Sequence, residues 1–263
     1  MLLERRINIS LNLQEFIFKE YMNTIRINRK NVLLIAHRGL SGLERENTYP
    51  AFVAAGNRSY FGIETDVHMT KDGKFVIIHD ENTMRVSLGE HIINVEENDY
   101  SALKDIVLPD LDGSKERQDI RIPLLSDYIK ICKKYGKKCV LEIKNTFSGE
   151  DLKRLIQEIK KEEYLENVIF ISFVLNNCIN LRKLLPENDI QWLTNGLVTE
   201  DMIKTLVKYK MNIDIFYEIL DKERIDKFHA YGIKVNCWTV DDKDKAEKLI
   251  SAGVDFITTN ILE

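Results

Sequence analysis

Short apolar segments alternate with amphipathic helical segments along most of this 263-residue chain, and that alternation limits the fold more than any other feature. The apolar segments lack the strict polar–apolar alternation of half-exposed strands, which is typical of parallel strands covered by helices on both faces. The predicted strands are Val32–Ala36, Gly62–Val67, Lys138–Ile143, Val168–Ser172, Ile190–Leu193, Met211–Phe216, Ile233–Cys237 and Val254–Thr258. The predicted helices are Thr48–Arg58, Ser126–Lys134, Glu150–Glu163, Val174–Leu185, Thr199–Tyr209, Asp221–Tyr231 and Asp241–Ala252.

Strands joined by helical crossovers in this order predict an α/β fold, a closed TIM-type (β/α)₈ barrel. Such a barrel takes about 250 residues, so residues 31–263 are expected to form it as one domain. An open, doubly wound sheet is the alternative, but no glycine-rich dinucleotide fingerprint supports it. Residues 1–30 precede the first strand and are predicted to be a helical extension, one amphipathic helix plus a connector.

One segment after the second strand interrupts the alternation. Lys71-Asp72-Gly73 is a turn signal between two apolar stretches, and the connection is too short for a helical crossover. We therefore expect Lys74–His79 to return antiparallel as a β-hairpin, with Asp66 opposite His79. The acidic, irregular stretch Glu90–Arg121 is expected to cover the barrel surface.

Composition limits the classes of function and the cellular location that are expected for the chain. The net charge of −4 argues against a nucleic-acid partner. The four cysteines form no CxxC pair, so they are interpreted as buried thiols in a reducing compartment. No apolar run is long enough for a transmembrane helix, and the N-terminus lacks the features of a signal peptide. A cytoplasmic enzyme is therefore expected.

Two acids lie two positions apart on the second strand, so Glu64 and Asp66 point to the same face. Inside a barrel, two unpaired carboxylates would repel each other and lose hydration, which is tolerable if a cation lies between them. An exposed edge strand with both acids in water is the alternative. The hairpin would bring His79 to the same mouth, although a histidine after an apolar run can also be simple packing.

The first strand ends in Ala36-His37-Arg38-Gly39, at the expected catalytic face of a barrel. Arg38 offers a planar fork for a phosphate, and His37 is a proton carrier near neutral pH. The strand ending in Glu142 and Lys144 adds a third acid and a second cation, unless that segment is solvated surface. Carboxylate oxygens suit one divalent cation, Mg²⁺ or Ca²⁺, better than zinc, and paired histidines can move protons. These residues indicate phosphodiester cleavage.

Several motifs occur in a defined order from about residue 32 to 260. They are AHRG, ENT, the run E-x-D-V-x-x-T-x-D-G-x-x-V-x-x-H-D, then IPLLSDYI, LEIK, ISF, NCWTV and AGVDFITTN. This set closely resembles the glycerophosphodiester phosphodiesterase family. The resemblance implies a TIM barrel with a hairpin excursion and metal-dependent hydrolysis of a small-molecule glycerophosphodiester to sn-glycerol 3-phosphate and an alcohol.

The resemblance also implies a role for each matching residue. His37 and His79 would be the acid–base pair, and Glu64, Asp66 and Glu142 would hold the metal. Arg38 and Lys144 would bind the phosphate, Trp238 would pack against the glycerol backbone unless it is a core residue, and Phe173 would line the pocket. Glu46 and Asn47 would stand behind the metal ligands or beside the metal.

Two positions depart from the family pattern. Arg45 stands where a proline usually precedes Glu-Asn-Thr, so this loop is expected to differ in shape. Asn260 replaces the aspartate of the terminal Thr-Asp motif, which weakens the inference there.

Two rival functions remain open, a lipid-directed phospholipase such as a lysophospholipase D and a barrel that binds glycerophosphate esters without cleaving them. The sequence does not indicate membrane association, and both a monomer and a homodimer are compatible with it. The head group of the substrate is not readable either.

Overall fold

The computed structural model of the protein describes residues 23–263. Eight parallel strands follow the order β1-β9-β8-β7-β6-β5-β4-β2, and pairing of β1 with β2 closes the ring. Their bounds are β1 Leu33–Ala36, β2 Gly62–Met69, β4 Lys138–Ile143, β5 Val168–Ser172, β6 Ile190–Thr194, β7 Asn212–Phe216, β8 Val235–Trp238 and β9 Phe256–Thr259. The predicted TIM-type barrel is therefore confirmed, and no strand end lies more than two residues from its prediction.

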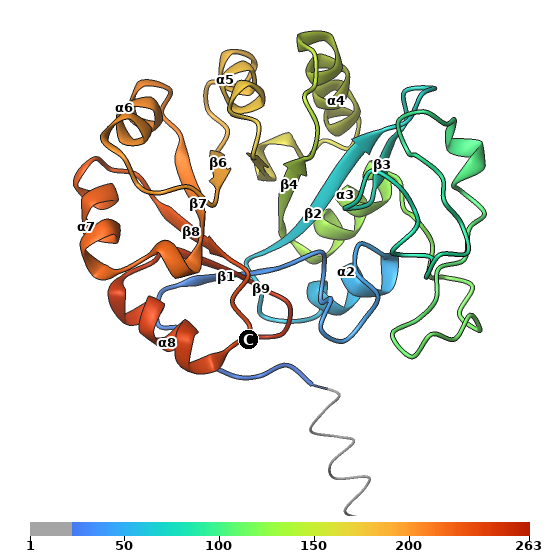
Figure 1. The fold of residues 1–263 in the computed structure, drawn as a ribbon, viewed down its shortest axis with the longest axis horizontal. Coiled ribbons are helices and arrows are strands. Elements are labelled where there is room, and N and C mark those ends of the chain that lie inside the picture. The colour runs from blue at the N-terminus through green and yellow to red at the C-terminus, as the bar shows by residue number, and fades with distance from the viewer. Residues whose placement is uncertain (1–22) are drawn as a thin grey trace, which may run out of the picture.

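The helices surround the barrel, as Figure 1 shows. Their bounds are α2 Tyr49–Gly56, α3 Leu125–Tyr135, α4 Gly149–Lys161, α5 Leu175–Leu184, α6 Glu200–Lys208, α7 Lys222–Ala230 and α8 Lys243–Ala252, with short 3₁₀ turns at Tyr100–Ala102, Leu165–Asn167 and Tyr217–Ile219. Local chemistry sets the helix starts. Ser148 and Asp151 form a reciprocal capping box at α4, and the Asp221 carboxylate accepts a hydrogen bond from the Arg224 N–H at α7.

Alternation along each strand divides the side chains into two shells. One set packs between strands and helices, as Ile213 and Ile215 of β7 do. The other set points into the barrel, where Ile35, Val140 and Leu193 belong to a small inner apolar cluster. The same alternation places Glu64, Asp66 and Glu142 on the inner wall, and all three are buried. The exposed edge-strand alternative is thus excluded.

The predicted hairpin forms, with a register that differs from the prediction by one residue. Strand β3 (Phe75–Ile77) runs antiparallel to β2 and pairs Val67 with Ile77. Ile78, not His79, stands beside Asp66, because the N–H of Ile78 donates to the Asp66 carbonyl. The expected pairing of Asp66 with His79 is therefore wrong. His79 lies one residue further on, where the chain leaves the strand.

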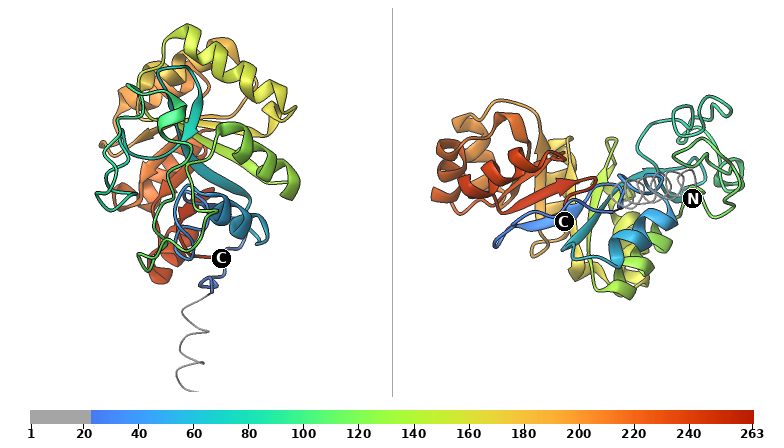
Figure 2. Two further views of the ribbon diagram at one scale, coloured as in Figure 1. Left: turned by 90° about the vertical axis from the view of Figure 1, so that its right-hand side faces the viewer. Right: turned by 90° about the horizontal axis from the view of Figure 1, so that it is seen from below.

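Residues 78–122 form an excursion beside the barrel, which Figure 2 shows at one side of the molecule. It contains one 3₁₀ turn and otherwise irregular backbone. The excursion has its own apolar cluster, which packs on the outer side of β3. The members are Val76, Ile78, Val86, Val95, Leu103, Ile106, Leu108, Ile120 and Ile122. This cluster gives the irregular segment a fixed structure close to the barrel mouth.

The helix predicted within residues 1–30 lies largely outside the described residues. Of that extension, the described part is extended chain in which Ile25 exchanges backbone hydrogen bonds with Ile261 and Glu263. All four cysteines are buried and free, as expected. Among residues 23–263, every helix is too short or too polar to span a bilayer.

Candidate active site

Three carboxylates meet at the C-terminal mouth of neighbouring strands. Glu64 and Asp66 come from β2 and Glu142 from β4, with one oxygen from each lying within 4.8 Å of the others. Asp66 and Glu142 are register partners on the two strands. Parallel pairing and the inward alternation together explain why residues 76 positions apart in the sequence share one site.

Two cations border this cluster. The Arg38 Nε lies 3.4 Å from Asp66 Oδ2, and its backbone N–H donates to Glu64 Oε2 at 2.7 Å. Lys144 Nζ lies 2.8 Å from Glu142 Oε1 and 3.4 Å from Asp66 Oδ1. Three acids against two bases leave the cluster with an excess of negative charge.

The pKa values follow from burial and from this charge imbalance. Burial, followed by the neighbouring acids, raises the pKa of both Glu64 and Glu142 above the usual range. Burial alone would also raise the pKa of Asp66, but Lys144 and Arg38 hold it below its usual value. Two of the three acids therefore resist ionisation when no further positive charge is present.

The residues fit a divalent cation. Asp66 Oδ1 is buried without a hydrogen-bond partner among the described residues, and Glu142 Oε1 has the Lys144 ammonium beside it at 2.8 Å. The donor set is entirely carboxylate oxygen, which suits a hard cation. A cation bound here would balance the excess charge and let Glu64 and Glu142 ionise.

His37 follows β1 and borders the same pocket. Its Nδ1 lies 2.7 Å from Oδ1 of Asn260. The Asn260 amide nitrogen donates to Asp241 Oδ2, so its oxygen must face the imidazole. His37 Nδ1 is then the protonated nitrogen, and Nε2 is left with a free lone pair. Burial, aided by the Arg38 charge, lowers the pKa of His37 to about 4.

His79 borders the pocket from the excursion. Its Nδ1 lies 2.6 Å from Asp80 Oδ1, which again leaves Nε2 free. Burial lowers the pKa of His79, while Asp66 and Asp80 oppose that shift. His68 on β2 supports the loop, since its Nε2 lies 3.2 Å from the His79 carbonyl.

An ion-pair network joins the two histidine-bearing segments. Arg85 donates to Asp80 and, through both terminal nitrogens, to Glu46 at 2.8 Å. Glu46 also accepts from Arg38 at 3.0 Å. Glu46 thus contacts guanidinium groups and is not part of the carboxylate cluster, whereas Asn47 donates to Asp66 Oδ2 at 2.8 Å.

The far wall of the pocket is mostly apolar. Phe173 and Trp238 meet edge to face with ring centroids 5.6 Å apart, and Leu193 and Ile171 complete the apolar part. The hollow between this wall and the carboxylates has a volume of about 60 Å³. It admits several waters or a small polar molecule, because one water needs about 10–15 Å³ of such space.

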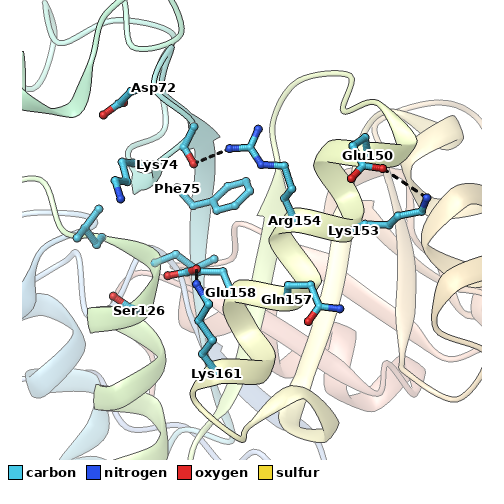
Figure 3. Close-up of a pocket in the computed structure, with 13 residues that line it drawn as sticks. Asp72, Lys74, Phe75, Ser126, Glu150, Lys153, Arg154, Gln157, Glu158 and Lys161 are labelled. Atoms are coloured by element: carbon cyan, nitrogen blue, oxygen red, sulfur yellow. Dashed lines mark hydrogen bonds and ion pairs between the residues drawn. The ribbon is translucent and has the colours of Figure 1, made fainter.

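A larger hollow of about 460 Å³ lies outside the barrel, between the hairpin and helices α3 and α4. Figure 3 shows its charged lining, in which Lys161 pairs with Glu158, Lys153 pairs with Glu150, and Arg154 donates to the Gly73 carbonyl. It contains none of the residues expected to carry chemistry. The carboxylate mouth, although smaller, is therefore the candidate site.

The structure brings all of the expected site residues to one mouth of the barrel or to its immediate border. Asp80, Arg85 and Asp214 are not among the predicted site residues, and Asn260 is predicted only to depart from the family pattern. Asp80 follows His79 directly, and Asp214 interrupts an apolar strand at an inward position, so both had a readable signal. Arg85 had no such signal, because only the folded excursion brings it to Glu46.

Arg45 is the residue that replaces the family's proline before Glu-Asn-Thr. Its side chain donates to the Val86 carbonyl and so joins its loop to the excursion.

Comparisons with known proteins give a consistent result. A family model described as the glycerophosphoryl diester phosphodiesterase family matches residues 37–263. A glycerophosphodiester phosphodiesterase of Caldanaerobacter subterraneus subsp. tengcongensis is 32% identical over 87% of this chain and 93% of its own length. A glycerophosphodiester phosphodiesterase of Bacillus subtilis is 24% identical, with 87% of this chain and 83% of that protein covered.

Solved structures agree in fold. The Oleispira antarctica phosphodiesterase in complex with the product sn-glycerol-3-phosphate has a TM-score of 0.79 and 25% identity, with 87% of this chain and 92% of that chain covered. A glycerophosphodiester phosphodiesterase from Thermotoga maritima has a TM-score of 0.68 and 25% identity, with 87% of this chain and 94% of that chain covered.

Proposed function

The chain belongs to the glycerophosphoryl diester phosphodiesterase family and is a glycerophosphodiester phosphodiesterase, and on that premise we propose how it works. His37 and His79 are the acid–base pair, Glu64, Asp66 and Glu142 hold one divalent cation, Mg²⁺ or Ca²⁺, and the products are sn-glycerol 3-phosphate and an alcohol. The sn-glycerol-3-phosphate bound in the Oleispira antarctica structure supports these products.

One observation carries the proposal. Both imidazoles border the carboxylate pocket, each has its Nδ1 fixed by an oxygen, and neither Nε2 makes a hydrogen bond with any residue from 23 to 263. Fixing Nδ1 selects the tautomer and points the free nitrogen to its task. Two such histidines on one pocket provide a proton acceptor and a proton donor for a displacement at phosphorus.

The partners of the two histidines differ, and this supports a division of roles. His37 is held by a neutral amide and has a lowered pKa, so it is unprotonated near pH 7 and suits the base that removes a proton from the nucleophile. Burial lowers the pKa of His79 as well, but the Asp66 and Asp80 carboxylates oppose that shift and stabilise an imidazolium, so His79 suits the acid that protonates the departing alkoxide.

Arg38 and Lys144 are the groups that bind the substrate phosphate. Both line the pocket and flank the carboxylates. The Arg38 backbone at φ 52° is held by the hydrogen bond from its N–H to Glu64, which fixes the direction of the side chain. A bound divalent cation supplies Lewis-acid polarisation of the phosphate and charge neutralisation.

The test is a comparison of His37→Ala, His79→Ala and His91→Ala. We expect the first two to lose about 10²–10⁴-fold in turnover, the usual range for one acid–base group. His91 is exposed on the excursion and makes no side-chain hydrogen bond with the described residues, so His91→Ala should keep its turnover. Turnover is measured on glycerophosphodiesters by coupled detection of sn-glycerol 3-phosphate, with and without a chelator.

Wild-type turnover in His37→Ala, with circular dichroism showing a native fold, would discard the acid–base assignment. Lysophosphatidylcholine belongs in the same substrate panel. Higher activity on it than on glycerophosphocholine would assign the enzyme to lipid substrates instead.

A further inference from the structure

Two buried polar atoms on the far wall of the pocket have no partner. Oδ1 of Asp214 on β7 and Nε1 of Trp238 on the adjacent strand β8 make no hydrogen bond with any described residue. Both residues line the pocket, and Asp214 is only 1% exposed. A buried carboxyl oxygen without a partner is costly, so such a group usually marks a missing ligand or a functional demand.

Other inward-pointing polar side chains of the neighbouring strands show that hydrogen bonds can be satisfied inside this barrel. Gln191, Asn236 and Thr258 also point into the barrel and are buried. They bond to one another, since Asn236 donates to Gln191 at 3.1 Å and Thr258 donates to Asn236 at 3.3 Å. Asp214 is excluded from that network although it is the register partner of Asn236. Its free oxygen is therefore left facing the pocket.

Asp214 is not placed to join the cation cluster. Strand β7 is four strands away from β2 in either direction around the ring, so Asp214 lies across the barrel from Glu64 and Asp66. It is also absent from the group of acids whose oxygens converge. Burial, with a smaller contribution from Glu142, raises the pKa of Asp214 well above its usual value. Its position across the barrel from the other acids therefore favours a hydrogen-bonding partner over the shared cation.

We propose that Asp214 and Trp238 form a hydroxyl-binding subsite that recognises the glycerol part of the substrate. Asp214 Oδ1 accepts a hydrogen bond from a substrate hydroxyl, and Trp238 Nε1 donates one. This inference rests on the proposed function, which places the phosphate at Arg38 and Lys144. The phosphate then lies on one side of the hollow and the hydroxyl groups on the opposite side. A small hollow with apolar walls and one acceptor and one donor suits a short polyol.

Binding of two small phosphates, sn-glycerol 3-phosphate and n-propyl phosphate, tests the subsite. They share the phosphate and the three-carbon chain, but n-propyl phosphate lacks both hydroxyls. Isothermal titration calorimetry with Mg²⁺ or Ca²⁺ present gives the ratio of their affinities. We expect the wild type to prefer sn-glycerol 3-phosphate by about tenfold or more, the scale of hydrogen bonds made in a buried site.

Asp214→Ala should reduce this preference to within about twofold while the affinity for n-propyl phosphate is kept. Trp238→Phe keeps the ring but loses the N–H, so it should lose part of the preference. Thr205→Val on α6 is the control, because it removes a hydroxyl outside the pocket that already has a partner, and the affinity ratio should not change. Asp214→Leu keeps a similar side-chain volume but offers no hydrogen-bond acceptor, so it provides a second variant if Asp214→Ala does not fold.

Three outcomes would overturn the subsite. These are equal binding of both phosphates by the wild type, an unchanged ratio in both Asp214 variants, and equal weakening of both phosphates in both of them. The assay requires no turnover, so it separates the two proposals. A wild type that prefers sn-glycerol 3-phosphate but hydrolyses no glycerophosphodiester would reject the proposed function and leave the subsite standing.

Discussion

Burial lowers the pKa of both imidazoles in the pocket, and the partners of their Nδ1 atoms oppose that shift to different degrees. Asn260 presents an amide oxygen to His37, whereas Asp80 presents a carboxylate to His79. A carboxylate stabilises the protonated ring far more than an amide does. Burial and the Arg38 charge lower the pKa of His37 to about 4, and the neutral amide of Asn260 opposes that shift less than the family's aspartate would.

Exchanging the two side chains of the Asn260–Asp241 pair should change the pH dependence of the enzyme. The double variant Asp241→Asn/Asn260→Asp keeps the hydrogen bond between the two positions and the total charge, but places the carboxylate on His37. The pKa of His37 should rise by about one unit or more. A raised pKa means that the ring becomes protonated at a higher pH, so the acid limb of the kcat/KM profile should move upward. Superimposable profiles for the wild type and the double variant would show that His37 is not the base.

At the residue scale, the sequence predicted the positions of the three acids better than the hydrogen-bond partners of the histidines. Glu64, Asp66 and Glu142 were predictable because alternation and strand ends follow from local sequence. The contact between His37 and Asn260 joins residues 223 positions apart, and it depends on where β9 ends relative to β1. Local patterns hold no such information. The alternation along its strand was enough to predict that Asp214 points inward. Only the packed barrel shows that its Oδ1 has no hydrogen-bond partner among the described residues.

At the scale of elements, strands and helices were predicted closely because each is a local pattern of apolar residues. The hairpin register was wrong by one residue, since the turn extends from Thr70 to Lys74 with a hydrogen bond from the Thr70 N–H to the Lys74 carbonyl. A turn signal indicates where the chain reverses, but its closing bond fixes the pairing. The excursion was not predictable in detail, because its apolar cluster joins residues from Val76 to Ile122 without a periodic pattern.

The turn after β1 depends on glycine. Gly39 has φ 77°, and a Cβ there would lie 2.7 Å from the backbone and the Cβ of Ala51. Gly39→Ala should therefore lower the free energy of unfolding by about 2–5 kcal/mol, from left-handed strain together with overpacking. Gly113→Ala is the matched control, since Gly113 has φ 84° and open space around it, and it should cost about 1–2 kcal/mol. Urea denaturation of both variants measures the difference, and equal losses would contradict the close approach of α2 to this turn.

At the scale of the whole molecule, we expect the carboxylate cluster to couple metal binding to folding. Three buried acids at one mouth outnumber Arg38 and Lys144, so in the metal-free fold they either repel one another or take up protons, and both cost free energy. A cation that binds only the folded chain adds stability in proportion to the logarithm of its concentration. At 100 times its dissociation constant the gain is about 2.7 kcal/mol.

Glu64→Gln should raise the stability of the metal-free protein and reduce the gain in stability that metal binding gives. Without metal, the variant should be more stable than the wild type by about 1–3 kcal/mol, because a neutral amide replaces a buried carboxyl group that must either take up a proton or stay charged beside two other acids. With Mg²⁺ or Ca²⁺, its gain should be smaller than that of the wild type, because one ligand charge is lost. The stability curves of the two proteins therefore cross as the metal concentration rises.

Thermal unfolding at a series of metal concentrations measures this crossing. Asp226 is an exposed acid paired with Lys222, so the control variant Asp226→Asn should leave the metal-induced gain unchanged. A Glu64→Gln protein that is less stable than the wild type without metal, yet gains the full metal increment, would show that the cluster does not hold the cation.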